Sequence, residues 1–290
     1  MRSLYYIAIF FLLLLLNACG KSVESNNVWF RDRNVCKKMV NKVLVYTVFV
    51  KDKKGEDWSY PARKEFGDSL QVALSWMEKQ AGLYDAQVNY ISELHPDVVV
   101  KGYPKKTVAE TKELISSEKG INKFNKHYDG IAKAVAIKVE KKEELEPLVG
   151  AVKSKERLIA KLRNIYQVES VVLIYAHKPE GLNHFYLTTN MLSNEDVEYI
   201  VTTFRSPTVL GYQICQLFGA APLMYNKSKK KELKSWEYVQ DHFPNDIMAN
   251  LGKPIHGLDI GVYNAYLLGW LYQSSPAFNQ LVPLREVYKE

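Results

Sequence analysis

The sequence lacks several residue patterns on which common enzyme classes depend. It has only three cysteines in 290 residues, and their spacing forms no zinc signature. Its six histidines include no two at metal-ligand spacing on one predicted helix. A glycine-rich phosphate loop and a G-x-S-x-G motif are also missing, which argues against P-loop and α/β-hydrolase chemistry.

Low-complexity tracts, internal repeats and nucleic-acid-binding motifs are likewise absent, so we expect no nucleic-acid partner. The formal net charge of +7 is a modest excess. It is spread over lysine-rich segments such as "NKSKKKELK" (226–234), which is typical of a solvated loop, with contact to anionic lipid or to a partner as the alternative. What is present is the composition of a globular protein, with 47% hydrophobic and 12% aromatic residues.

The first 18 residues have the pattern of a secretory signal peptide. They carry one charge, Arg2, ahead of an apolar run from Ile7 to Leu16, which is too short for a typical membrane span. The run ends in "LNAC", which resembles the lipobox of bacterial lipoproteins, although an ordinary cleaved signal with an incidental cysteine is the alternative. The resemblance implies that Cys19 is acylated and holds the protein on a membrane of the bacterial cell envelope, with the outer membrane favoured.

Residues 19–41, which include the polar stretch "GKSVESNN", are predicted to form a tether, and residues 42–290 a folded domain. Cys36 falls in this tether, and Cys215 lies in a predicted helix, so we expect no disulfide between them. Hydrophobic periodicity predicts strands at 42–50, 86–92, 131–139, 170–177 and 184–190, the last at a sheet edge. It predicts helices at 56–82, 143–166, 208–219 and 262–273, with 101–126 as an insertion. Because strands and helices alternate before a loop-rich helical C-terminal subdomain, the fold class is α/β.

The helix predicted within "SPTVLGYQICQLFGAAPLMY" (206–225) has two distinct faces on a helical wheel. One is an apolar stripe of Leu210, Ile214, Leu217 and Phe218, which we expect to pack on the sheet. Tyr212 and Gln216, four residues apart, lie on the other side. We therefore expect this second face to meet a cleft or water, and Gly219 to end the helix.

This stretch resembles the active-site helix of zinc metallopeptidases of the zincin class, closest to the metzincin-like branch. That family carries H-E-x-x-H-x-x-G-x-x-[HD] and a downstream Met-turn. Counted from Gly219, the metal-ligand positions fall on Tyr212, Gln216 and Pro222, and the general base on Gln213. "FPNDIM" (243–248) looks like the Met-turn, with Met248 under the would-be metal. The resemblance implies a zincin-like mixed sheet with an active-site-type helix.

All four chemical positions are replaced. A tyrosine phenol stays protonated at neutral pH, a glutamine amide is a poor zinc ligand, and proline has no side-chain donor atom. Gln213 cannot accept a proton from water, which is the task of the family's glutamate. We therefore expect no catalytic residue, no metal and no cofactor. A buried thiol, and not a nucleophile, is expected at Cys215.

The leading hypothesis is a lipid-anchored lipoprotein whose metallopeptidase-like domain is inactive. It would bind a peptide or protein partner through the former substrate cleft, at Tyr212, Gln213, Gln216 and Pro222. An extended peptide could add to the edge strand at 184–190, because strand addition needs neither zinc nor glutamate. Two alternatives stay open, an active zinc hydrolase with displaced ligands and an inert structural surface lipoprotein.

Overall fold

The computed structural model describes residues 38–51, 57–100, 113, 115–143, 154–178, 186–188, 199–223 and 233–272. The predicted signal peptide (1–18), Cys19, Cys36 and most of the predicted tether lie outside the described residues. Within these ranges, every helix falls short of the length and apolar character needed to cross a membrane.

The centre of the fold is a mixed six-stranded sheet. Five strands run in the order β2-β1-β4-β6-β5, and the short β3 also pairs with β1. β1 is parallel to β2, β3 and β4, and β4 is parallel to β6, whereas β5 runs antiparallel to β6 at the end of the order. The strands are β1 (Asn41–Lys51), β2 (Val88–Leu94), β3 (Val99–Val100), β4 (Ser170–His177), β5 (Tyr186–Thr188) and β6 (Ile200–Thr202). The α/β class predicted from the sequence is therefore confirmed.

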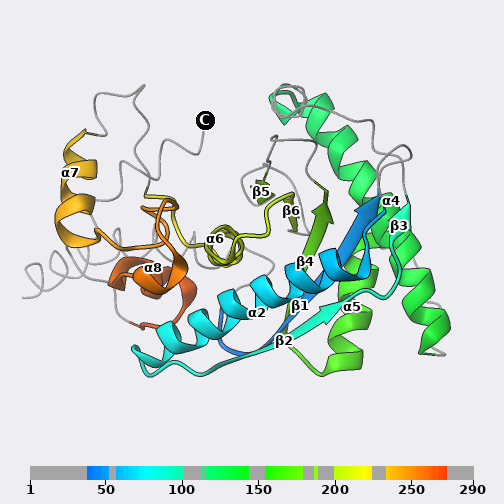
Figure 1. Cartoon of the computed structure of the whole chain (residues 1–290), viewed down its shortest axis with the longest axis horizontal. Coiled ribbons are helices and arrows are strands. Elements are labelled where there is room, and N and C mark those ends of the chain that lie inside the picture. Colours follow the sequence, from blue (N-terminus) through cyan, green and yellow to red (C-terminus); the bar gives the residue numbers. More distant parts are fainter. Residues whose placement is uncertain are drawn as a thin grey trace, which may run out of the picture.

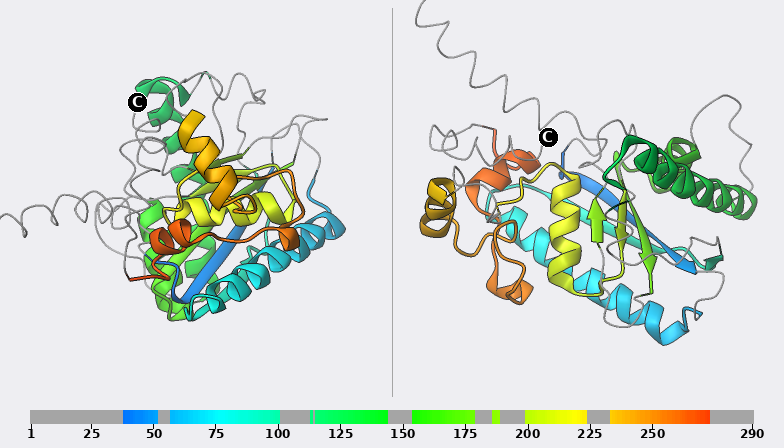
Figure 2. Two further views of the ribbon diagram at one scale, coloured as in Figure 1. Left: turned by 90° about the vertical axis from the view of Figure 1, so that its left-hand side faces the viewer. Right: turned by 90° about the horizontal axis from the view of Figure 1, so that it is seen from above.

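β1 is buried on both faces because its side chains alternate between two hydrophobic cores. Val45 and Phe49 belong to the core that also contains α2 (Tyr60–Gly82) and α6 (Pro207–Leu217). Leu44 and Val48 belong to the opposite core, with α4 (Glu118–Lys142) and α5 (Ser154–Tyr166). Figure 2 shows α2 and α4 on opposite sides of the sheet. The molecule thus has three layers, with helices covering both faces.

The helix α2 begins where the sequence predicts a start. The Ser59 hydroxyl accepts a hydrogen bond from the Ala62 N–H, and Pro61 stands in the first turn, where its missing N–H costs nothing. Its buried residues recur at helical spacing, including Phe66, Leu70 and Met77.

The C-terminal part lies to one side of the sheet (Figure 1). It comprises α7 (Leu233–His242), the 3-10 helix η3 (Ile255–Gly257) and α8 (Val262–Leu268). The domain also begins earlier than residue 42, the boundary predicted from the sequence. Met39 is fully buried, its N–H donates to the Leu268 carbonyl, and its carbonyl accepts from the Trp270 indole at 2.7 Å.

Most predicted elements are present, but the strand predicted at 131–139 is wrong. This segment belongs to α4, which also includes part of the predicted insertion at 101–126. "IAKAVAIKV" alternates like a strand over a short window, yet its buried residues continue the 3.6-residue spacing of a longer helix. They are Phe124, Tyr128, Ile131, Ala132, Val135, Ala136 and Val139. Ser117 caps this helix by accepting from the Gly120 N–H at 3.2 Å.

Candidate functional site

The helix α6 carries three of the four positions that the family resemblance assigns to an active site, Tyr212, Gln213 and Gln216. Pro207 stands at its start, and it ends at Leu217. Gly219 follows with φ of 96°, and the Ala220 N–H donates to the Cys215 carbonyl at 3.0 Å. A left-handed residue after the last turn is the usual glycine helix end, so the prediction that Gly219 ends this helix is confirmed.

The prediction that α6 has one face toward a cleft or water is wrong. The stripe of Leu210, Ile214, Leu217 and Phe218 is buried as expected, but every residue from 208 to 217 is buried as well.

All of these residues are buried because α6 is enclosed by other elements on two sides. A side-chain carbon added at Gly211 would lie 3.2 Å from Ile255 and 3.3 Å from Ile247, in the C-terminal part. The same carbon would also meet Ala73 of α2 at 3.9 Å, whereas the Gln213 side chain hydrogen-bonds to β5 and β6 of the sheet. Helices that are apolar nearly all round are buried in this way.

The three α6 residues that the resemblance assigns to an active site are therefore part of the packing. Tyr212, 3% exposed, packs edge to face against Tyr186 of β5, with ring centroids 6.0 Å apart. The Gln213 amide nitrogen donates to the carbonyls of Leu187 and Val201, each at 3.4 Å, and its buried amide oxygen has no hydrogen-bond partner among the described residues. Gln216 is also only 3% exposed.

A backbone hydrogen bond joins the segment of Pro222 to the turn of Met248. The Leu223 N–H, next to Pro222, donates to the Met248 carbonyl at 2.8 Å. Pro222 is itself half-buried, whereas Met248 is fully buried. The segment after α6 and the turn predicted as a Met-turn thus lie side by side.

A buried carboxylate, Asp246, organises this turn. Its oxygens accept hydrogen bonds from the N–H groups of Met248 (2.7 Å) and Gly261 (2.9 Å) and from the Asn264 amide (3.0 Å). Asn264 in turn accepts from the Ala221 N–H at 2.9 Å. Burial raises the pKa of Asp246 from 3.8 to about 6, although these hydrogen bonds oppose the shift. The network joins the end of α6, the Met248 turn and α8.

Sequence reasoning missed this network. The available signal was an aspartate two residues before Met248, because aspartate side chains often accept from the backbone N–H two residues on. Asn264 gave no signal, since only the tertiary fold brings it to Asp246.

Metal-binding groups do not gather here. Throughout the ranges that the structure describes, no cluster of three or more His, Cys, Asp or Glu residues could hold a metal ion. His242 is exposed and stacks on Tyr238 with ring centroids 4.0 Å apart. Cys215 is a free, fully buried thiol whose pKa burial raises well above its usual value, with its sulfur 3.8 Å from that of Met77. The thiol is therefore poorly suited to nucleophilic chemistry.

A pocket of about 340 Å³ lies on the opposite face of the sheet, between the β1–β2 surface and helices α4 and α5. Its lining includes Tyr46 of β1, His95 and Glu93 on or beside β2, and Lys142 and Tyr166 from the helices. Sequence reasoning assigned none of these residues a role. The signal was the alternation in "YISEL", followed by His95, which places Glu93 and His95 on the same face of the sheet.

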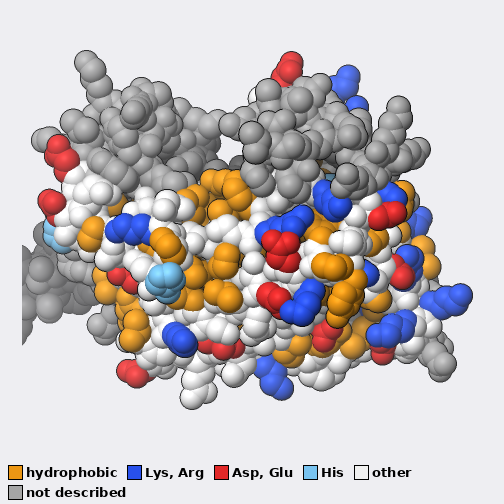
Figure 3. Space-filling model, in the orientation of Figure 1, with side chains coloured by type: hydrophobic (Ala, Val, Ile, Leu, Met, Phe, Trp, Pro, Cys, Tyr) orange, Lys and Arg blue, Asp and Glu red, His pale blue; other side chains and the backbone are white. Residues whose placement is uncertain are grey.

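The described surface over α2 is of mixed chemical character. Figure 3 shows acidic and basic side chains interspersed with hydrophobic ones on this face. Some of them pair, as in Lys64 with Asp68 (2.7 Å) and Arg205 with Glu65 (2.6 Å). Such exposed pairs are ordinary surface features of small energetic weight.

Comparison with known proteins gives no match to this chain, whether with protein-family models, curated proteins or solved structures.

Proposed function

We propose that the protein is a lipid-anchored lipoprotein of the bacterial cell envelope with a zincin-like domain that is not catalytic and binds a peptide or protein partner. One observation carries the non-catalytic part. The residues at the positions of the first ligand, the base and the second ligand, Tyr212, Gln213 and Gln216, are buried in the packing around α6. Neither their chemistry nor their placement suits a metal-bound water.

The zincin-like reading is supported by how the elements follow one another. β5 ends the order of strands at one side of the sheet, and α6 contacts it. The segment after α6 is hydrogen-bonded to the Met248 turn. This arrangement agrees with the resemblance, which implies an edge strand beside the helix and a methionine turn near the third ligand position.

For partner binding, we propose that an extended peptide adds to β5. Tyr186 is half-buried, and its ring contacts those of Phe204 (centroids 5.6 Å apart) and Tyr212 (6.0 Å). Because Tyr212 is itself buried, it supports Tyr186 and does not offer a surface to the partner. Strand addition uses backbone N–H and C=O groups, so it needs neither a metal nor a carboxylate.

The metal claim is tested on the full-length chain purified in detergent without a metal-binding tag. Elemental analysis should find far less than one zinc per chain, and casein should stay intact during long incubation. A chelator should leave the melting temperature unchanged, because no metal contributes to folding. If the chain contains one zinc, and the chelator removes both this zinc and a peptidase activity, the domain is an active enzyme with other metal ligands.

The anchor is tested by labelling cells with a fatty acid. The wild-type protein should incorporate the label and sediment with membranes, whereas Cys19→Ala should do neither. Cys215→Ala is the matched control, because that thiol is buried in the folded domain, and it should label like the wild type. Equal labelling of Cys19→Ala would refute lipidation at this cysteine.

Peptide binding is tested by selecting displayed random peptides on the detergent-purified chain. A selected peptide should slow hydrogen–deuterium exchange of the backbone at residues 186–188, and Tyr186→Ala should weaken its binding. Tyr60→Ala, at a site 72% exposed on α2, serves as the control. Protection confined to other segments, or no selected peptide at all, would favour an inert structural lipoprotein.

A further inference from the structure

The helix α4 exposes a line of lysines along one face. The helix has 25 residues, which include seven lysines, three acidic residues and no arginine. At 100° per residue, five exposed lysines fall within an arc of about 80°, and at 1.5 Å per residue they extend over about 33 Å. This lysine stripe consists of Lys119, Lys123, Lys126, Lys133 and Lys141.

Two of the three acidic residues of α4 are engaged away from this stripe. Glu140 is 8% exposed and pairs with Arg157 at 2.9 Å and with Lys161 at 2.7 Å, on the side of α5. Asp129 accepts a hydrogen bond from the Lys155 N–H at 3.2 Å. Among the residues that the structure describes, no lysine of the stripe takes part in an ion pair. The positive charge of this face is therefore not neutralised by its described surroundings.

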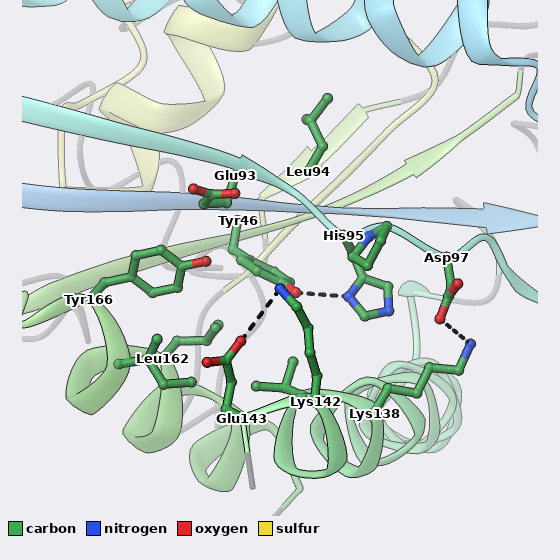
Figure 4. Close-up of a pocket in the computed structure, with 13 residues that line it drawn as sticks. Tyr46, Glu93, Leu94, His95, Asp97, Lys138, Lys142, Glu143, Leu162 and Tyr166 are labelled. Atoms are coloured by element: carbon green, nitrogen blue, oxygen red, sulfur yellow. Dashed lines mark hydrogen bonds and ion pairs between the residues drawn. The ribbon is translucent and has the colours of Figure 1, made fainter. Parts of the chain in front are cut away.

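The other two lysines of α4 are paired. Figure 4 shows Lys138 directed toward Asp97 and Lys142 directed toward Glu143, with N–O distances of 3.0 Å and 3.4 Å. Both lysines line the pocket between the sheet and the helices, so they point away from the lysine stripe. The helix thus has paired lysines beside the pocket and unpaired lysines on its outer face.

The helix α2, on the opposite side of the sheet, carries its charges differently. It has three basic and three acidic residues, and some of them pair, as Lys64 does with Asp68. In α4, Lys123 instead has lysines on both neighbouring turns, Lys119 and Lys126. Like charges three or four residues apart on a helix repel each other. A face of one sign, kept at this cost, indicates a partner of the opposite charge.

An exposed apolar side chain lies on the same arc. Ile137, between Lys133 and Lys141, is 53% exposed. The strand β3, which contacts α4, adds Val100 at 55% exposed. Figure 1 shows α4 and β3 on the outer side of the molecule, away from α7 and α8. Because the buried face of α4 is packed on the sheet, this outer face is suited to peripheral contact with a membrane, where lysines meet headgroups and an apolar group reaches the acyl boundary.

We propose that the lysine stripe docks the domain onto an anionic lipid surface. The choice of lipid rests on the proposed function, because a lipid anchor holds the domain beside a membrane at high effective concentration. Lysine is a flexible, strongly hydrated point charge, whereas arginine recognises single phosphates or carboxylates in a fixed geometry. A straight row of lysines is therefore suited to the diffuse negative charge of a fluid membrane surface.

The test uses the full-length chain, incorporated from detergent into vesicles of phosphatidylcholine alone or with about 30% phosphatidylglycerol. A water-soluble reagent acetylates exposed lysines, and mass spectrometry gives the rate at each position. The stripe lysines should react about fivefold or more slowly on the anionic vesicles than on the neutral ones, because lipid headgroups cover them. Lys79, exposed on α2, is the internal control and should react equally fast on both. This readout uses the wild-type chain and does not depend on any variant folding.

Salt and flotation separate this contact from the proposed anchor. Flotation with the neutral vesicles reports the anchor alone. At about 0.5 M sodium chloride, where the Debye length is only about 4 Å, the slowing at the stripe should vanish and the flotation should persist. If the chain does not float with neutral vesicles, the anchor is wrong. The stripe is then decided by comparing the chain on anionic vesicles with the free chain.

Two triple variants of equal net charge complete the test. The stripe variant combines Lys123→Gln, Lys126→Gln and Lys133→Gln, and the control combines Lys42→Gln, Lys64→Gln and Lys79→Gln. All six positions are exposed, so both variants should melt within about 3 °C of the wild type. The stripe variant should reduce the slowing at Lys119 and Lys141 to less than about twofold, and the control variant should keep it.

The proposal is overturned if the stripe lysines react equally fast on both kinds of vesicle. It is also overturned if Lys79 is slowed as much as the stripe, or if the two triple variants lose the slowing to the same extent.

Discussion

The two faces of the sheet differ in how they use some of their polar side chains. On the α6 face, Asp246 and Asn264 are fully buried and bond to backbone groups or to each other, so they hold the fold together. On the α4–α5 face, the Glu93 side chain and the His95 Nε2 have no partner within the described chain. The comparison teaches that most polar groups near α6 are used as structure, with the Gln213 amide oxygen as an exception among the described residues, whereas the unmatched groups of the other face line a pocket.

The largest expected effect comes from breaking the network on the α6 face. Asp246→Ala leaves three buried donors without an acceptor, each costing about 1–3 kcal/mol, so the free energy of unfolding should fall by about 4 kcal/mol or more. Urea unfolding measures this change. Asp241→Ala, at an exposed position on α7, is the control and should lie within about 0.5 kcal/mol of the wild type. A loss below about 1 kcal/mol in Asp246→Ala would mean that the network is not structural.

The next largest effect is expected for Tyr212→Ala. This variant distinguishes an α6 that is packed on all sides from the water-facing α6 predicted from the sequence. A residue facing water would cost little stability when truncated, but the buried ring against Tyr186 should cost about 3 kcal/mol. Ile214→Ala, on the predicted apolar stripe, should cost about 2–5 kcal/mol. Similar losses in the two variants are therefore expected in urea unfolding. A near-neutral Tyr212→Ala would restore the cleft-facing interpretation.

The two faces should also respond to pH in opposite directions. The pKa of Asp246 is raised to about 6 in the folded state, so its contribution to stability is complete below about pH 4 and is lost as pH rises through 6. The pKa of His95 is lowered to about 4, so its contribution is complete above about pH 6.5 and is lost as pH falls toward 4. Each shift of about two units corresponds to about 2–3 kcal/mol.

Denaturant unfolding at several pH values between 4 and 7 tests this contrast with two variants. The stability of the wild type relative to Asp246→Asn should decrease as pH rises across this range. Its stability relative to His95→Gln should increase over the same range. Two slopes of the same sign would show that one of the two groups is not buried as the structure has it.

The smallest expected effect is on the pocket face. Glu93→Gln should change the free energy of unfolding by less than about 0.5 kcal/mol, because this half-buried side chain forms no hydrogen bond or ion pair with the described residues. Thermal and urea unfolding against the wild type measure the difference. A loss above about 1.5 kcal/mol would indicate a structural role for Glu93 and weaken the contrast between the faces.

The secondary structure could be predicted wherever the local sequence pattern fits only one kind of element. β1 is a continuous apolar run, and α2 has a capping serine, a proline start and regular apolar spacing, so both were predicted with nearly correct bounds. The segment 131–139 has a pattern that fits both a strand and a helix, and the preceding turns of α4 decide between them. β6 was missed because three residues are too few to show a period.

The same distinction applies to the candidate sites, where side-chain chemistry follows from the sequence and side-chain contacts do not. The sequence by itself determined that Tyr212, Gln213, Gln216 and Pro222 offer poor chemistry for zinc, because that follows from side-chain identity alone. It also determined where α6 ends, since Gly219 is free to adopt a left-handed conformation. Only the tertiary structure decided that α6 is covered on both sides, because the residues that cover it are distant in the chain. It likewise brought Asn264 to Asp246 and Tyr46 to His95, contacts that no local spacing could specify.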